Sequence, residues 1–324
     1  MPLTPLKAQA LDTDTFLTAL YVEIDDFFQR EGPPEARRPG PAAALNRSEV
    51  LCLALFGRWG TFPSERAFWR YARAHLRPFF PGLGERSPFN RLARAYGVDL
   101  QRWATGLAQH FGAGGALYEA LDLTAVPTRS CHRRGRGWLA GPADVGYRSR
   151  LGGFAGFKVL VSCTPRGVIT GLGVAPASPN EPPFTESFLA LRHAAAGRAQ
   201  MPGVGLPARG MYVLDKGFAG RERPWVWWQA WGVEVLCAPP AYPGTTPWPK
   251  AARRRVAPLR QIIETVFAKL QGGFGLAQER PHSVAGFLAR LAARVALHNF
   301  CIGLNRRLGR PDLAFAGLVD YAAL

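Results

Sequence analysis

Apolar side chains recur at spacings of three and four through the first ~115 residues, and capping residues interrupt them. This pattern predicts short helices and no strand. The expected N-caps are Asp12 or Thr13 for a helix through Phe28, Asn46 for one through Trp59, Ser64 for one through Leu76, and Ser87 and Asp99 for two more. We therefore predict an all-α domain over residues 1–115, with DNA binding as its expected role.

The helices expected after Asn46 and Ser64 are joined by the sequence GTFP. The later one carries four arginines, Arg66, Arg70, Arg73 and Arg77. This arrangement fits a helix-turn-helix that reads DNA. Most helix pairs that bear arginines are not recognition modules, so both interpretations stay open.

From Ala116 the pattern changes to strands. LYEALDLTAV, GFKVLVSCTP and GVITGLGVAP read as three strands, the last two joined as a hairpin through Pro165 and Gly167. A helix (181–196), the strand MYVLDKGF, a helix (221–231) and the strand VEVLCAPP are expected next. A basic loop (241–258), a helix (259–271) and a long terminal helix opened by Ser283 complete the prediction.

The order βββαβαβα requires a mixed sheet, with antiparallel strands at one side, crossovers at the other and helices on both faces. We predict an α/β domain over residues 116–310 and a C-terminal tail over 311–324. Within it, the segment WVWWQAW places Trp225, Trp228 and Trp231 on one helical face. Core packing is the preferred interpretation of that face.

The composition of the chain indicates which class of binding partner to expect. Lys and Arg outnumber Asp and Glu by 40 to 23, which leaves a net charge of +17 and favours a polyanion, nucleic acid above all. The apolar runs fall short of the ~20 residues that a membrane span needs. The N-terminus does not resemble a secretory signal, and the five scattered cysteines contain no CxxC. A cytoplasmic, nucleoid-associated protein with reduced cysteines is expected.

Three acids stand out by position. Asp122 interrupts the apolar run of the first strand, and Asp215 follows the run Met211–Leu214, at the strand end where open α/β sheets bind ligands. Glu264 lies four residues after Arg260, beside the apolar stripe of its helix. Taken singly, each has a bland explanation: a strand-ending or capping aspartate, or a solvated helical glutamate.

Taken together, the acids lie on a first strand, a later parallel strand and a following helix, which can converge on one sheet edge. Converging carboxylates repel each other unless cations neutralise them, and hard oxygen ligands select Mg²⁺ or Mn²⁺. Two such ions activate the attacking oxygen and stabilise the departing one in phosphoryl displacement. That chemistry agrees with the positive charge, because nucleic acid supplies the phosphates.

The motifs LYVEIDDFFQ, LDLTAVPTRSCHRR, GFKVLV, VLDKGF and RQIIETVFAKLQGGFGLAQERPHSV also resemble those of a known family. From about Leu20 to Leu304 the chain resembles bacterial insertion-sequence transposases of the DDE class, especially the insertion sequence 982 family. The resemblance implies an RNase H-like catalytic domain with Asp122, Asp215 and Glu264 as catalytic metal ligands. It further implies Mg²⁺-dependent nicking at element ends of double-stranded DNA, transfer of the 3′ hydroxyl to target DNA, and a homodimer in the DNA complex.

Phosphate contacts are expected from Arg260, Lys216 and Lys158, and DNA contacts from Trp248 with three neighbouring arginines, Arg253, Arg254 and Arg255. Trp248 fits either base stacking or the anchoring of its loop. The chain departs from the related Tyr-Arg-Glu-Lys pattern, because Ala257 replaces the tyrosine and Gln271 the lysine. Two alternatives therefore remain: a catalytically silent DNA-binding remnant, and an RNase H-like nuclease that cuts without joining.

Overall fold

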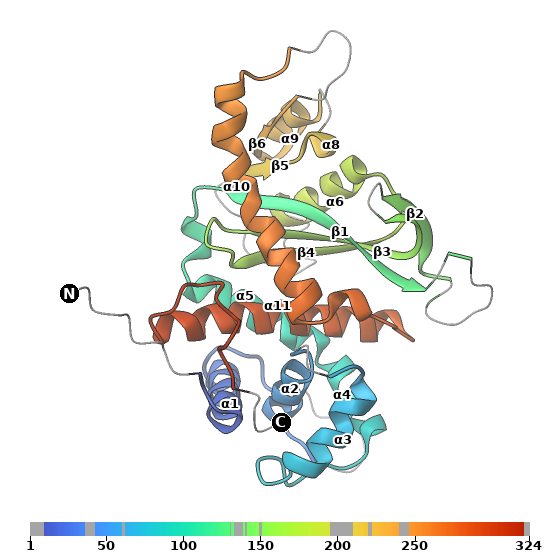
Figure 1. The fold of residues 1–324 in the computed structure, drawn as a ribbon, viewed down its shortest axis with the longest axis vertical. Helices are drawn as coiled ribbons and strands as arrows, with labels where there is room; N and C mark the ends of the chain where they lie inside the picture. Colours follow the sequence, from blue (N-terminus) through green and yellow to red (C-terminus); the bar gives the residue numbers. More distant parts are fainter. Residues whose placement is uncertain are drawn as a thin grey trace.

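A computed structural model describes residues 10–35, 43–59, 62–129, 131–132, 139, 141–148, 151–194, 210–219, 222–239 and 246–320. In this part of the chain, helices lead and a mixed sheet follows (Figure 1). The leading helices are α1 (Thr13–Arg30), α2 (Arg47–Phe56), α3 (Glu65–His75), α4 (Arg86–Ala95) and α5 (Gly97–His110).

The N-caps of the first helices are the predicted ones. The side chains of Asp12, Asn46 and Ser64 each accept a hydrogen bond from a main-chain N–H in the first turn of their helix. The caps predicted for α4 and α5 are wrong. Because α5 follows α4 across Tyr96 alone, no side chain caps it, and Asp99 lies in its first turn near the positive end of the helix dipole.

Six strands form one sheet within the described ranges: β1 (Glu119–Arg129), β2 (Asp144–Arg148), β3 (Gly152–Cys163), β4 (Ile169–Pro176), β5 (Met211–Leu214) and β6 (Glu234–Cys237). β1 pairs antiparallel with β3, which carries β2 and β4 on its other edge. β5 and β6 continue the sheet in parallel beyond β1. The mixed α/β prediction is confirmed, and β2 is a strand that it lacked.

Helices cover both faces of the sheet. The remaining helices are α6 (Glu181–His193), α8 (Lys216–Ala219), α9 (Arg223–Trp231), α10 (Lys250–Ala268) and α11 (Val284–Arg307). One face packs on α6 and α9 through a cluster that includes Leu121, Leu160 and Trp227. The other face shares a larger core with α10, α11 and the N-terminal helices, and α11 lies between those helices and the sheet (Figure 1).

α10 begins earlier than predicted. Part of the expected loop, 241–245, lies outside the described residues, but Lys250 to Pro258 are helical. Lys, Ala and Arg are good helix formers, and Pro258 lies on an exposed stretch where water can satisfy the carbonyl that it leaves unbonded. Arg253, Arg254 and Arg255 are therefore exposed on a helix rather than in a loop.

The tryptophan prediction is wrong for Trp225 and Trp228, whereas Trp231 is half-buried and packs against the core cluster that includes Trp227. Trp225 and Trp228 are 64% and 48% exposed, whereas Trp227 is the fully buried member of the segment. The helix is short and presents the opposite side to the sheet, so an aromatic stripe did not identify its buried face. The two exposed rings pack on each other with centroids 5.3 Å apart.

Among the described residues, one helix is long and apolar enough to cross a membrane. It is α11, and 89% of its most apolar stretch is buried inside the fold, as in the core helix of a soluble protein. Ser283 caps it as predicted.

Candidate active site

Asp122, Asp215 and Glu264 meet around one guanidinium. Arg260 Nη1 lies 3.1 Å from Asp215 Oδ1, and Arg260 Nη2 lies 3.3 Å from Glu264 Oε1 and 3.9 Å from Asp122 Oδ2. Because the same nitrogen reaches Asp122 and Glu264, their oxygens are no farther apart than those two distances combined. The predicted convergence of the three acids at one sheet edge is therefore present.

Local structure explains how each acid arrives there. Asp122 lies on β1 with its side chain on the face that α10 covers, since its neighbours Ala120 and Val161 belong to that core. Asp215 follows the last residue of β5, the parallel neighbour of β1. Glu264 lies one helical turn after Arg260, so α10 brings both side chains to the same place.

The three carboxylates differ in exposure. The Asp122 side chain is 16% exposed, against 46% for Asp215 and 62% for Glu264. Burial raises the pKa of Asp122, although the Leu123 N–H, which donates to its Oδ1 at 2.7 Å, and the charge of Arg260 act in the opposite direction. Asp122 is thus fixed against the sheet, whereas the other two carboxylates have room to move.

These acids suit a hard divalent cation by chemistry, since carboxylate oxygens are the ligands that Mg²⁺ prefers. In the part of the chain that the structure describes, however, no group of three acidic, histidine or cysteine side chains is placed to hold a metal ion. The Arg260 guanidinium occupies the space between the acids. It supplies one positive charge to the three acids, and the charge of Arg148 also acts on Asp122. A divalent cation would add to that compensation.

Neighbouring contacts hold this edge in place. Gln271, which stands at the lysine position of the related pattern, donates from Nε2 to Thr124 Oγ1 at 2.7 Å, two residues along β1 from Asp122. Cys237, at the end of β6, donates its thiol to the main-chain carbonyl of Asp215 at 3.3 Å. The first contact is with a side chain of β1 and the second holds the backbone of Asp215, and neither was predicted.

The other residues that were expected to contact phosphate or DNA do not all lie beside the three acids. Lys158 points to the other face of the sheet, where it is 7% exposed and donates to the Pro179 carbonyl at 2.5 Å. Burial lowers its pKa, and the structure does not bring it to the acids. Lys216 begins α8, and its side chain lies outside the described part of the structure. Trp248 is half-buried just before α10.

Arg253 lies seven residues before Arg260, which is two helical turns and so the same side of α10, ~10 Å away. Arg148 was missed, because the short β2 gave too little alternation to be recognised. Arg148 lies 3.8 Å from Glu181, at the start of α6. Its positive charge opposes the rise that burial causes in the pKa of Asp122. Glu181 in turn lies beside Gly217, just beyond Asp215.

Comparison with protein-family models, curated proteins and solved structures found no match for this chain. The geometry and the sequence pattern therefore carry the functional argument.

Proposed function

We propose that this protein is a DNA transposase that cuts at the ends of a mobile element and joins them to target DNA. One observation carries the proposal: acids distant in the sequence, from two adjacent strands and a helix, contact one guanidinium at a single sheet edge. A structural ion pair needs one acid for Arg260, whereas three acids converge on it here. A site for divalent cations explains that convergence.

The topology supports the finer fold within this proposal. The strand order β4-β3-β1-β5-β6, with three antiparallel strands and then two parallel ones, agrees with that expected of an RNase H-like domain. β2 adds to the edge of β3, and α10 supplies the third acid. The net charge of +17 suits a DNA substrate.

In this mechanism Asp122, Asp215 and Glu264 hold two Mg²⁺ or Mn²⁺ ions, which when bound would activate the attacking oxygen and stabilise the departing one. Asp122 provides the fixed ligand, because the sheet and the Leu123 N–H set its position. The more exposed Glu264 adjusts to the ions. Arg260, released from the acids, is placed to contact a phosphate oxygen, and Arg253 extends that contact along α10.

The test is a reaction on DNA. Full-length protein is incubated with Mg²⁺, a target plasmid and duplexes taken from the DNA that flanks its own coding sequence. We expect cut and joined products from the unmodified protein and none from Asp122→Ala. Glu234→Ala, which removes an exposed carboxylate from neighbouring β6, is the matched control and should remain active.

The product pattern separates the alternatives. Cutting without joining would replace the transposase proposal with a nuclease. Specific binding of the flanking DNA with no cutting in Mg²⁺ or Mn²⁺ would indicate a silent remnant, in which Arg260 serves as a permanent counter-charge.

A further inference from the structure

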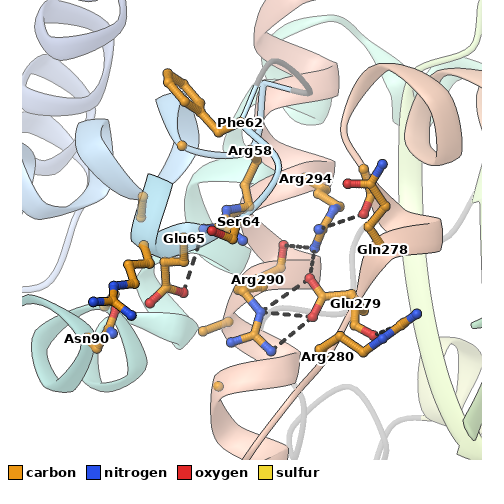
Figure 2. Close-up of a pocket in the computed structure, with 18 of the residues that line it drawn as sticks. Arg58, Phe62, Ser64, Glu65, Asn90, Gln278, Glu279, Arg280, Arg290 and Arg294 are labelled. Carbon is orange, nitrogen blue, oxygen red and sulfur yellow. Dashed lines mark hydrogen bonds and ion pairs between the residues drawn. The ribbon is translucent and has the colours of Figure 1, made fainter. Parts of the chain in front are cut away.

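A pocket of about 390 Å³ lies where the N-terminal helices meet α11 (Figure 2). Its walls come from five segments: the end of α2 with the start of α3, most of α4, Leu100 on α5, the segment over residues 274–283, and the first half of α11. The acids of the candidate active site do not line it. We call it the arginine pocket.

Its lining is strongly basic. Among the described residues that line it, seven arginines stand against two glutamates. The arginines are Arg58, Arg66, Arg86, Arg94, Arg280, Arg290 and Arg294, and the glutamates are Glu65 and Glu279. Such a surplus of like charge in a concave site attracts an anion.

The deep part of the pocket is built around Glu279, which is 3% exposed. Arg294 and Arg290 point toward its carboxylate and approach it to 2.5 and 2.9 Å (Figure 2). Burial would raise the pKa of Glu279, but these two arginines and Arg58 lower it to about 2. One carboxylate therefore pairs with two guanidinia, and the charge of a third, Arg58, also acts on it.

The positive charge of Arg58 is only partly compensated by nearby acids. Its side chain is 11% exposed, and its nearest acid, Glu65, lies 3.8 Å away and is shared with Arg86 at the same distance. Burial, followed by repulsion from Arg294, lowers the pKa of Arg58 to about 10. A buried cation held at a depressed pKa gains from an added negative charge.

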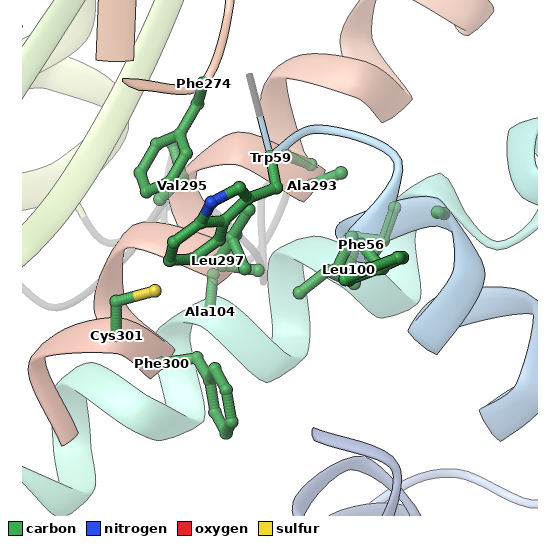
Figure 3. Packing of buried hydrophobic residues seen from close by; sticks show 14 of the residues in the cluster. Phe56, Trp59, Leu100, Ala104, Phe274, Ala293, Val295, Leu297, Phe300 and Cys301 are labelled. Atoms are coloured by element: carbon green, nitrogen blue, oxygen red, sulfur yellow. The ribbon is translucent and has the colours of Figure 1, made fainter. Parts of the chain in front are cut away.

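The pocket is preformed, because its floor belongs to the hydrophobic core. Trp59 and Phe274 both line it, and their rings pack 5.7 Å apart among residues of α11 (Figure 3). Gly275 takes a left-handed conformation with φ of 65°, which turns the chain so that Glu279 faces α11. Ser283, the N-cap of the 24-residue α11, adds the positive end of a helix dipole.

We propose that the arginine pocket binds a phosphate of the DNA backbone away from the scissile bond. Guanidinium groups pair with phosphate oxygens in a planar, two-bonded geometry, which suits the residues at its mouth. Arg280 connects it with the active site, since Arg280 donates to the Pro127 carbonyl on β1 at 3.3 Å. Pro127 lies five residues beyond Asp122, ~17 Å along the strand.

The distance from Asp122 to Pro127 is about the length of five nucleotides of one DNA strand. A duplex with its scissile phosphate at Asp122 can therefore reach the pocket with a phosphate several positions away. This placement rests on the proposed function, whereas the anion site itself rests only on the pocket.

Matched pairs of variants test the proposal. Arg66→Ala with Arg94→Ala removes two exposed charges at the pocket, and Arg30→Ala with Arg91→Ala removes two exposed charges from the N-terminal helices, outside it. Affinity for a labelled duplex of arbitrary sequence is measured by fluorescence anisotropy over a salt series. Divalent ions are left out, so binding is separated from cutting.

We expect the pocket pair to bind roughly 30-fold more weakly near 0.15 M salt, with a log–log salt slope lower by about two, as for two lost phosphate contacts. The outer pair should bind within about threefold of the unmodified protein. Equal losses in both pairs, or no loss in the pocket pair, would overturn the proposal.

Binding of free phosphate is tested in a separate experiment. Thermal melting with inorganic phosphate shows whether the pocket takes the isolated anion. A pocket pair that loses this stabilisation but keeps its DNA affinity would overturn the DNA assignment. Failure of the two proposals is distinguishable: a protein that binds DNA through the pocket but never cuts it contradicts only the transposase, whereas cutting with indifferent pocket variants contradicts only the pocket.

Discussion

The Arg260 cluster and the Glu279 cluster are opposites in composition. Around Arg260, three carboxylates share one guanidinium, and two of them are largely exposed. Around Glu279, two guanidinia pair with one carboxylate that is almost fully buried, and Arg58 adds a third positive charge nearby. The first cluster gathers more acids than guanidinia and the second more guanidinia than acids, and each borders solvent through at least some of its members.

A third cluster shows what a purely structural ion pair looks like in this fold. Arg192 and Glu119 are fully buried, form two hydrogen bonds at 2.5 and 3.1 Å, and balance one charge with one. Ser162 and Tyr212 accept further bonds from Arg192. Buried charges persist when paired and hydrogen-bonded, so an unbalanced cluster calls for a further partner. The two proposals made above follow this difference in sign: a cation is proposed beside the acids at Arg260, and an anion beside the arginines at Glu279.

The largest expected effect comes from Glu279→Gln. It leaves Arg290 and Arg294 without their buried counter-charge, so we expect the free energy of unfolding to fall by about 3–5 kcal/mol. Inorganic phosphate should restore more stability to this variant than to the unmodified protein. Chemical denaturation with and without phosphate measures both, and a variant as stable as the original would contradict the comparison.

Acid should weaken the same cluster. The pKa of Glu279 is lowered in the fold to about 2 from an ordinary value of 4.5. Its contribution is therefore complete above pH 4.5 and is lost as the pH falls toward 2. Melting temperature against pH should show a decline in this window that is smaller in Glu279→Gln. Parallel curves would assign the acid sensitivity to other groups.

Glu264→Gln should reduce DNA cutting by about 10²–10³-fold, because it removes one charged ligand at the reacting phosphate. DNA binding without divalent ions should stay unchanged. Gln261→Ala, an exposed change one turn earlier on α10, is the control for the helix itself. Equal activity of Glu264→Gln and the unmodified protein would remove Glu264 from the site.

Arg260→Gln tests the role of the positive charge among the three acids. Without the guanidinium the acids repel one another, so we expect a loss of about 1 kcal/mol in stability without divalent ions. Added Mg²⁺ should raise the melting temperature of this variant by more than that of the original. Arg253→Gln, on the same side of α10, should respond to Mg²⁺ as the original does. An Mg²⁺ response equal in all three proteins would argue against a cation site.

The smallest effect on stability is expected from Asp122→Asn. The pKa of Asp122 is raised by burial, so the fold favours its neutral form, and stability tied to that form is lost as the pH rises through the raised pKa. Asparagine keeps the bond from Leu123 without the charge. At neutral pH the melting temperature should therefore rise by roughly 1–3 °C while cutting is lost. An unchanged or lower melting temperature would show that the buried negative charge of Asp122 does not destabilise the fold.

Much of the fold could be predicted because its rules act over a few residues. Asp12, Asn46, Ser64 and Ser283 mark helix starts through bonds to N–H groups two or three positions ahead. Period-two apolar runs identified β1, β3 and β4. Within the candidate site, the one-turn spacing of Arg260 and Glu264 required their side chains to meet.

What the sequence determined by itself was thus the identity and order of most elements, the acids that they carry and the positive charge of the whole. The tertiary structure alone decided that Arg260 also reaches Asp122 and Asp215, that Lys158 faces away from the acids, and that Trp227 rather than its neighbours is buried. The arginine pocket likewise exists only where five separate segments meet. Capping and periodicity are local, whereas the direction of a side chain across a packed interface depends on partners far away in the chain.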